Sequence, residues 1–138
     1  MSYGLLKGKK GIIFGALNEL SIAWKVAEKA YEEGAVFTLT NTPVAIRMGT
    51  INLLAENTGS IIIPGDATKE EEIEMVLLKS IEALGGKVDF ILHSIGMSPN
   101  VRKGFSYDTL NYNFFLQTID ISALSFHKFY YMQENMMP

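Results

Sequence analysis

The sequence of 138 residues contains no cysteine and only two histidines. Without cysteine the chain can form neither disulfides nor thiolate metal sites, and it has no cysteine nucleophile. Two histidines are too few for a histidine-rich zinc site, so we expect no resident metal. These absences exclude the disulfide-stabilised and zinc-finger classes of small protein.

Concentrated positive charge and long apolar runs are also missing. The formal net charge is −3, and lysine and arginine form no patch suited to a nucleic-acid backbone. The first residues, MSYGLLKGKKG, contain no apolar segment of signal-peptide length, and no later run reaches the roughly 18 residues that span a membrane. We therefore expect a cytoplasmic protein that binds neither nucleic acid nor membranes.

Short runs typical of β-strands alternate with segments of helical periodicity. Strands are predicted at residues 11–14, 35–40, 60–64 and 87–93. Helices are predicted at about 22–33, 43–58, 68–84 and 107–132, and one break can interrupt the last of them. Thr68 and Glu71 have the spacing of a capping box at the third helix.

This alternation predicts the fold class. Apolar strands separated by helices favour an α/β protein with a three-layer Rossmann-type parallel sheet of about four strands, flanked by helices on both faces. At 48% hydrophobic residues, 138 residues suffice for a single domain with its own core. Ligands of such sheets bind beyond the carboxyl ends of the strands, which directs attention to the loops after Phe14, Thr40, Gly65 and His93.

The loop after the first predicted strand reads GALNELSIA, with one glycine where a dinucleotide-binding loop commonly has three. Gly15 suits the tight turn, and Ser21 and Ala23 are small residues near the two later positions. The serine hydroxyl and the amides at the helix start offer donors to a phosphate. From this loop alone, an ordinary turn with Ser21 as helix cap remains an equal alternative.

Four segments together resemble one known family. GALNELSIA, GDAT, LHSIG and DISALSF resemble, in order and spacing, the bacterial NADH-dependent enoyl-[acyl-carrier-protein] reductases of the short-chain dehydrogenase/reductase superfamily. That family carries a first loop reading Gly-x5-Ser-Ile-Ala, as Gly15 and Ser21–Ala23 do here. The resemblance covers about residues 4–128 and implies an oxidoreductase of fatty acid synthesis that uses NADH.

The resemblance also implies roles for individual residues. The residues expected to contact the cofactor or substrate all lie in or next to the loops that follow the predicted strands. By this resemblance the cofactor phosphates meet Gly15, Ser21 and Ile22, the adenosine ribose meets Thr42, the adenine meets Asp66 and Ala67, the nicotinamide side meets Ser94, Ile95 and Gly96, and the acyl substrate meets Ser98. For Ser98 a plain loop serine before Pro99 is an equal alternative.

Three further polar residues receive no catalytic assignment. His93 is expected to be a hydrogen-bonded structural histidine at the end of a buried strand, and His127 a helix-surface or interface residue. Asp120 has either a structural or relay role or is a solvated or capping aspartate.

The sequence departs from the family in one important respect. Enoyl reductases act through a tyrosine and a lysine separated by six residues on a later helix, and Tyr3 with Lys10 has this spacing only before the first strand. We therefore expect residues 1–138 to be a single dinucleotide-binding domain truncated before the catalytic helix, with an incomplete sheet and no activity alone. The alternative is a non-catalytic nucleotide-binding or interaction module.

The expected partners follow from the same resemblance. The substrate would be an enoyl thioester of acyl carrier protein, and the complete family fold is a homo-tetramer. The apolar side chains of the last predicted helix support an oligomer, because they are more than the half-sheet can cover. They are Ile121, Leu124, Phe126, Phe129 and Tyr130. NADH is preferred over NADPH, since no acidic residue or arginine pair follows Thr40 and only Arg47 lies near.

Overall fold

A computed structural model describes residues 1–136 and contains a parallel sheet of three strands. The order is β2–β1–β3, with β1 at Lys10–Phe14, β2 at Val36–Thr40 and β3 at Phe90–His93. In this register Ile12 lies opposite Thr38 on one side and Ile91 on the other. The predicted α/β class with a parallel sheet is confirmed, and the sheet is incomplete.

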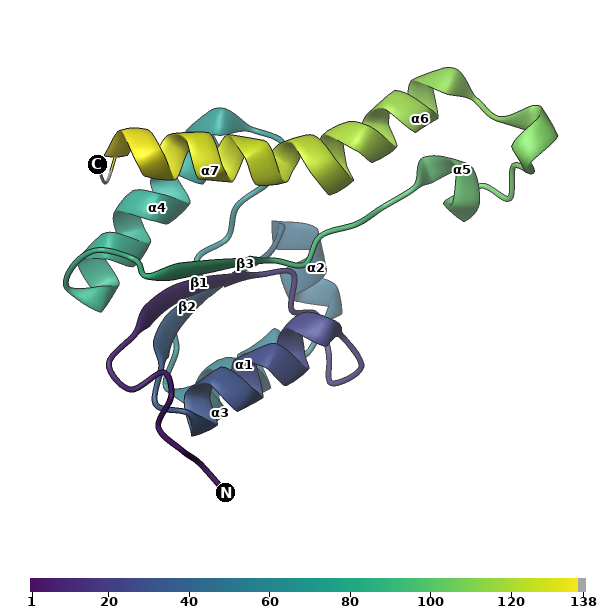
Figure 1. Ribbon diagram of the computed structural model, residues 1–138. Coiled ribbons are helices and arrows are strands. Elements are labelled where there is room, and N and C mark those ends of the chain that lie inside the picture. The colour runs from purple at the N-terminus through teal and green to yellow at the C-terminus, as the bar shows by residue number, and fades with distance from the viewer. Residues whose placement is uncertain (137–138) are drawn as a thin grey trace.

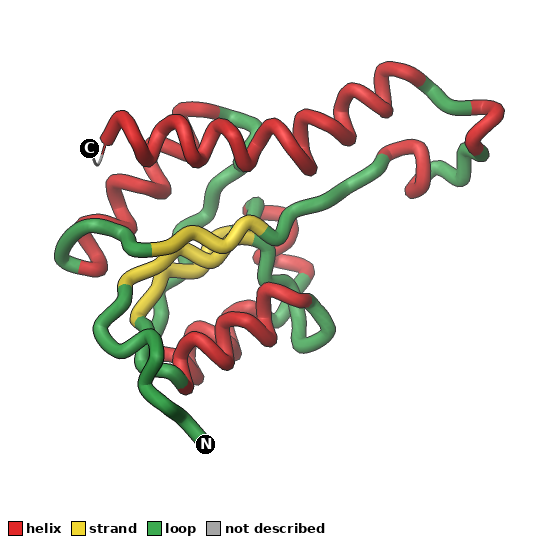
Figure 2. The backbone as a smooth tube through the Cα atoms, in the orientation of Figure 1, coloured by secondary structure: helices red, strands yellow, loops and turns green. Residues whose placement is uncertain are grey.

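Helices cover both faces of the sheet (Figures 1 and 2). On one face lie α1 at Ile22–Glu32 and α3 at Ile51–Thr58, and on the other lie α4 at Glu70–Leu84 and α7 at Ser125–Met136. Because side chains alternate along a strand, Ile13 packs with the α1 and α3 side while Ile12 and Phe14 pack with the α4 and α7 side. Two apolar cores therefore flank one sheet.

The prediction of a full strand at residues 60–64 is wrong. This segment forms a single bridge between Ile62 and Leu39, with Leu39 N donating to Ile61 O and Ile63 N to Leu39 O. Gly65 N also donates to Asn41 O at 3.0 Å, but the return hydrogen bond from Asn41 N to Ile63 O, which a second bridge needs, does not form within the described residues. The segment still lies beside β2, on the side away from β1. The chain therefore runs outward from β1 through β2 to this segment, and then crosses back to place β3 on the other side of β1.

The helix predicted across residues 43–58 is broken in two. The first part is α2 at Pro43–Met48, and α3 begins at Ile51. At the break, Thr50 N donates to Leu17 O at 2.9 Å, and a Cβ on Gly49 would collide with the same carbonyl oxygen. The loop after β1 therefore packs directly on this break, which a continuous helix could not allow.

The chain after β3 leaves the sheet and returns as a long helical segment (Figure 1). It passes through α5 at Pro99–Arg102 and a 3₁₀ turn, η1, at Tyr107–Thr109. It then continues as α6 at Tyr112–Ile119, a π-helical segment, η2, at Asp120–Leu124, and α7. The predicted break falls at residues 110–111, before α6.

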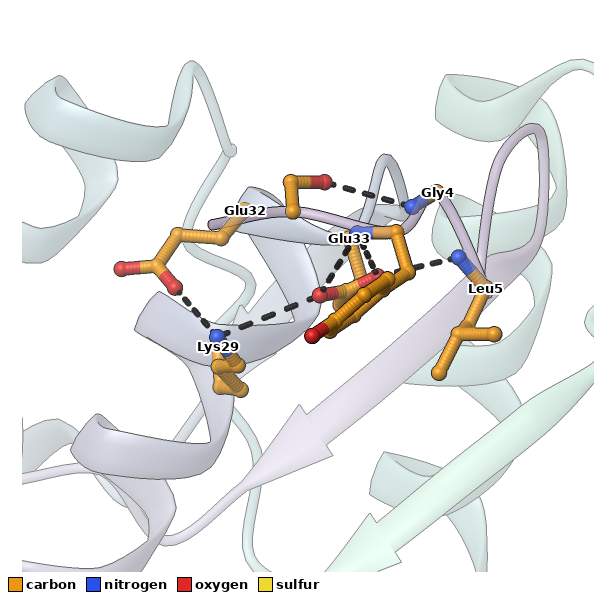
Figure 3. A network of polar contacts seen from close by, with 7 residues as sticks. Gly4, Leu5, Lys29, Glu32 and Glu33 are labelled. Atoms are coloured by element: carbon orange, nitrogen blue, oxygen red, sulfur yellow. Dashed lines mark hydrogen bonds and ion pairs between the residues drawn. The ribbon is translucent and has the colours of Figure 1, made fainter.

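The N-terminal residues are held by a buried carboxylate. Glu33, 5% exposed, accepts hydrogen bonds from Leu5 N at 3.0 Å and Tyr3 N at 3.1 Å, and Lys29 approaches it at 3.9 Å (Figure 3). Hydrogen bonds from the amides of Leu5 and Tyr3 lower the pKa of the Glu33 carboxyl. Among residues 1–136, no helix has both the length and the apolar character needed to cross a membrane.

Candidate functional site

A cavity of about 630 Å³ lies beyond the carboxyl ends of the strands. Its volume falls in the range of small-molecule and cofactor sites. Five of the ten residues expected to form the site line it: Thr42, Asp66, Ala67, Ile95 and Gly96. These residues follow β2, the bridging segment and β3, so the fold brings three separate loops together.

Gly15 and Ser94 lie next to each other where β1 and β3 end. Gly15 has φ of 110°, and a Cβ at this position would collide with the carbonyl oxygen of Ser94. Ser94 N donates to Phe14 O and Gly15 N to Thr40 O, each at 3.0 Å. This one position therefore needs glycine for both its backbone angle and the close approach of β3.

Ser21 shapes the first loop from within. Its Oγ donates to Asn18 O at 2.6 Å and accepts from Leu17 N at 3.2 Å. Ser21 is the N-cap residue of α1, but within the described chain its side chain makes no capping hydrogen bond. The amides at the start of α1 are thus the groups left to meet an anion.

Ser21 and Ile22 face a different hollow from the other five residues. Both line a shallow groove of about 520 Å³ along the outer side of α1, with apolar neighbours such as Leu20 and Val26. The described structure therefore does not gather all ten expected residues into one cavity.

Asp66 is oriented by its own loop. Its Oδ1 accepts from Thr68 N at 2.9 Å and from Thr68 Oγ1 at 2.7 Å, while Asp66 N donates to Glu72 at 2.7 Å. The capping box predicted for Thr68 and Glu71 is wrong, because Thr68 bonds to Asp66 and the N-cap is Lys69. Hydrogen bonds from Lys69 and from the Asp66 amide lower the pKa of Glu72, which keeps this acceptor ionised.

Asn41, which the sequence reasoning missed, joins the loops around the cavity. Its side-chain Nδ2 donates to Ala16 O at 2.9 Å and its Oδ1 accepts from Thr42 N at 2.8 Å. The backbone oxygen of Asn41 accepts from Gly65 N at 3.0 Å. A polar residue directly after a buried strand was the available signal. The neighbouring Thr42 uses its Oγ1 to cap α2 through Ala45 N at 3.3 Å.

The loop after β3 carries the remaining expected residue. Ser98 is the N-cap of α5, and its Oγ accepts from Val101 N at 3.4 Å. It is not among the residues that line the cavity in the described chain, whereas its neighbour Met97 is. Ser122 Oγ in turn accepts from Met97 N at 3.1 Å, which ties this loop to the π-helical segment.

His93 has the structural hydrogen bond expected of it. Its Nε2 lies 2.7 Å from Ser125 Oγ, and that hydroxyl donates to Ile121 O at 2.6 Å. The single hydrogen of the Ser125 hydroxyl goes to Ile121 O, so the hydrogen between Ser125 and His93 must belong to Nε2 of His93. Burial lowers the pKa of His93, which favours the neutral imidazole with its hydrogen on Nε2.

The other two polar residues also have clear positions. Asp120 lines the cavity and forms an ion pair with Lys128 at 2.9 Å, but its side chain is 42% exposed and it is the C-cap residue of α6, so features of both interpretations are present. His127 is exposed on α7 and lines a shallow groove of about 240 Å³ with Tyr131. Arg102 and Gln117, which sequence reasoning did not identify, also line the cavity.

These features together define a class of protein. Three features are the parts of a dinucleotide-binding α/β domain: a parallel sheet with helices on both faces, a ligand-sized cavity where the direction of winding reverses, and a helix joined to the first strand by the single loop 15–21.

Comparison with known proteins identifies the family. Residues 15–138 match the family model described as enoyl-(acyl carrier protein) reductase, and the chain belongs to this family.

Individual relatives agree with the family assignment. The chain is 36% identical over 124 residues to enoyl-[acyl-carrier-protein] reductase [NADH] 2 of Rhizobium meliloti, covering 89% of this chain and 46% of that protein. It is 34% identical to the NADH-dependent FabI reductase of Aquifex aeolicus, covering 88% and 45%. The crystal structure of a FabI–NADH complex from Alistipes finegoldii matches with a TM-score of 0.95 and 61% identity, covering 97% and 47%. The chain thus spans about half the length of the relatives it matches.

Proposed function

We propose that this chain is the cofactor-binding part of an NADH-dependent enoyl-[acyl-carrier-protein] reductase that acts in fatty acid synthesis in the cytoplasm. The observation that carries the proposal is the cavity at the strand ends, where Thr42, Asp66, Ala67, Ile95 and Gly96 meet in a chain 61% identical to a FabI crystallised with NADH.

Residues of the cavity, together with the start of α1 outside it, fit a dinucleotide. The amides of Ile22 and Ala23 lie in the first turn of α1, where they lack intrahelical partners and suit the diphosphate. Asp66 commits Oδ1 to Thr68, and within the described residues Oδ2 has no protein donor, so it suits the exocyclic amine of adenine. Thr42 lies where the adenosine ribose would pass.

The nicotinamide half would lie against the loop after β3. Among the described residues, only the Ser122 hydroxyl, at 4.0 Å, lies near the position of a Cβ on Gly96, so a flat ring can approach this backbone closely. Ile95 supplies an apolar wall, Gly15 and Ser94 hold the ends of the strands, and Ser98 lies toward the acyl substrate. NADH supplies the hydride for the trans-2-enoyl double bond of the thioester carried by acyl carrier protein.

None of the 138 residues is proposed as a catalytic acid. The tyrosine and lysine that the resemblance requires are not found at their spacing after β3, so residues 1–138 alone are expected to bind cofactor without turnover. The second candidate function, a non-catalytic nucleotide-binding module, uses the same cavity, so cofactor binding alone does not separate the two. Complementation of an enoyl reductase mutant by the complete natural protein distinguishes them.

Cofactor binding is tested by calorimetry with NADH and NADPH. We expect NADH to bind more tightly, because the loop after β2 presents Thr42 and no cation cluster to a 2′-phosphate. The variant Asp66→Asn keeps one acceptor but turns the other into a donor, and should weaken NADH binding about tenfold. Arg47→Ala, on an exposed position outside the cavity, is the matched control and should change nothing.

Two results would contradict this proposal. The first is no measurable binding of NADH by the folded chain. The second is NADPH binding as tight as NADH binding and abolished by Arg47→Ala, which would make Arg47 a reader of the 2′-phosphate.

We also propose that the protein is a homo-oligomer, and a tetramer in its complete form. Apolar side chains that remain half exposed on the late helical segment support this: Leu124, Phe126 and Tyr130.

A further inference from the structure

Lys128 connects two walls of the cavity from behind. Its Nζ donates to Thr68 O at 3.0 Å and to Asp120 Oδ1 at 2.9 Å. Thr68 and Asp120 both line the cavity, but Thr68 precedes α4 and Asp120 begins the π-helical segment η2. Lys128 itself lines the shallow groove on the other side, with Glu70 and His127. One side chain thus joins segments 52 residues apart in sequence, from Thr68 to Asp120.

The position of Lys128 is set by the core. The next residue, Phe129, is 1% exposed and packs edge-on against Phe14, with ring centroids 5.4 Å apart. Phe14 is the last residue of β1 and directly precedes Gly15. Because the Phe129 ring cannot move without disturbing this packing, the backbone that carries Lys128 is held at a fixed distance from the first loop.

Holding Thr68 also orients Asp66. Thr68 donates twice to Asp66 Oδ1, through its amide and its hydroxyl, so the plane of the Asp66 carboxylate follows the position of Thr68. Thr68 O, the remaining polar atom of its backbone, is the atom that Lys128 holds. A line of contacts therefore runs from Lys128 through Thr68 to the carboxylate that faces the cavity.

We propose that Lys128 is a positioning residue for the adenosine half of the bound dinucleotide. This inference rests on the proposed function and adds a residue outside the cavity to it. Lys128 fixes the loop of Asp66 and Thr68 before the ligand arrives, which removes the cost of ordering that loop on binding. The side chain of Lys128 is 24% exposed and that of Asp120 is 42% exposed, so solvent weakens the ion pair and the effect is moderate.

The test uses AMP and NADH as probes in calorimetric titrations of the 138-residue chain. Lys128→Met keeps the length and apolar stem but removes the charge, and should weaken both ligands by the same factor, about three- to tenfold. Lys128→Arg keeps the charge and should bind within about twofold of the unchanged chain. Lys79→Met, the same change on an exposed position of α4, is the matched control and should have no effect.

Binding is measured at a temperature where circular dichroism shows each variant to be folded, so that a lower Tm does not affect the comparison. If the unchanged chain fails to bind NADH, the proposed function fails and this inference fails with it. If the unchanged chain binds and Lys128→Met binds equally well, only the role of Lys128 is overturned. Equal losses for Lys128→Met and Lys128→Arg, or for Lys79→Met, would likewise overturn it.

Discussion

Individual residues explain how the first loop folds with a single glycine. Gly15 is the position where both the backbone angle and the contact with Ser94 exclude a side chain. Ala23 is fully buried in the core against the sheet, where a small residue is enough for helix and strand to approach. Ser21 uses its hydroxyl to close the loop on Leu17 and Asn18. The three positions thus have different requirements, and only the first demands glycine.

Gly15→Ala should therefore destabilise the fold far more than an alanine at another glycine of positive φ. We expect a loss of about 3 kcal/mol from backbone strain and the collision with Ser94. The matched control is Gly59→Ala at the end of α3, where φ is 63° and no described atom lies within 4 Å of the added Cβ. That change should cost about 1 kcal/mol.

Urea denaturation followed by circular dichroism measures both changes at Gly15 and Gly59. Equal losses at the two positions would mean that the approach of β3 to Gly15 imposes no constraint beyond φ.

Among the elements, α7 depends most on packing. Its residue Phe129 was expected to be part of an apolar surface, and that expectation is wrong, since the side chain lies in the core with Phe14 and with Ile73 of α4. Because α7 also carries Ser125 and Lys128, the same anchor sets the contacts to His93 and to the loop of Thr68.

Phe129→Ala should lower the free energy of unfolding by about 3–5 kcal/mol, because it leaves a cavity in the core. Phe126→Ala on the same helix is the control, since Phe126 is half exposed and meets the His93 ring in a T-shaped arrangement with centroids 5.5 Å apart. We expect the control to cost about 1 kcal/mol. Thermal and urea unfolding of the two variants measures the difference, and equal values would mean that α7 is held by contacts other than Phe129.

At the scale of the whole molecule, the sheet is bounded by β3, which pairs with β1 on one side only in the described residues. A strand with a free edge and the half-exposed apolar residues of the late helical segment both favour association. The 138-residue chain should therefore form dimers or larger species.

Light scattering at micromolar concentration tests this association. Tyr130→Lys, at a position 56% exposed on α7, should shift the distribution toward monomer because it adds charge to the apolar face. Tyr107→Lys in η1, away from α7, is the control and should leave the distribution unchanged. A clean monomer for the unchanged chain would contradict the prediction.

The sequence by itself determined the local elements that carry their own signals. β1, β2 and β3 are short runs made mainly of apolar and β-branched residues, and α4 ends at Leu84 with Gly85 as its C-cap, where φ of 68° suits glycine. The motif resemblance named Thr42, Asp66, Ala67, Ile95 and Gly96, which follow the strand ends and line one cavity, and their contact with a cofactor stays a prediction. The strand and helix-end predictions are confirmed because strand runs and glycine caps act over a few residues.

Tertiary structure alone decided the features that depend on distant partners. Residues 60–64 form a single bridge because, within the described residues, Asn41 N does not return the hydrogen bond to Ile63 O that a second bridge beside β2 needs. The helix after Thr42 broke because Gly49 and Thr50 pack on Leu17. Asn41 and Lys128 make contacts with loops far away in the chain, and although Asn41 stands directly after a strand, no local pattern predicts which partners either residue meets. Such contacts have no sequence period, and they exist only once the sheet has brought the segments together.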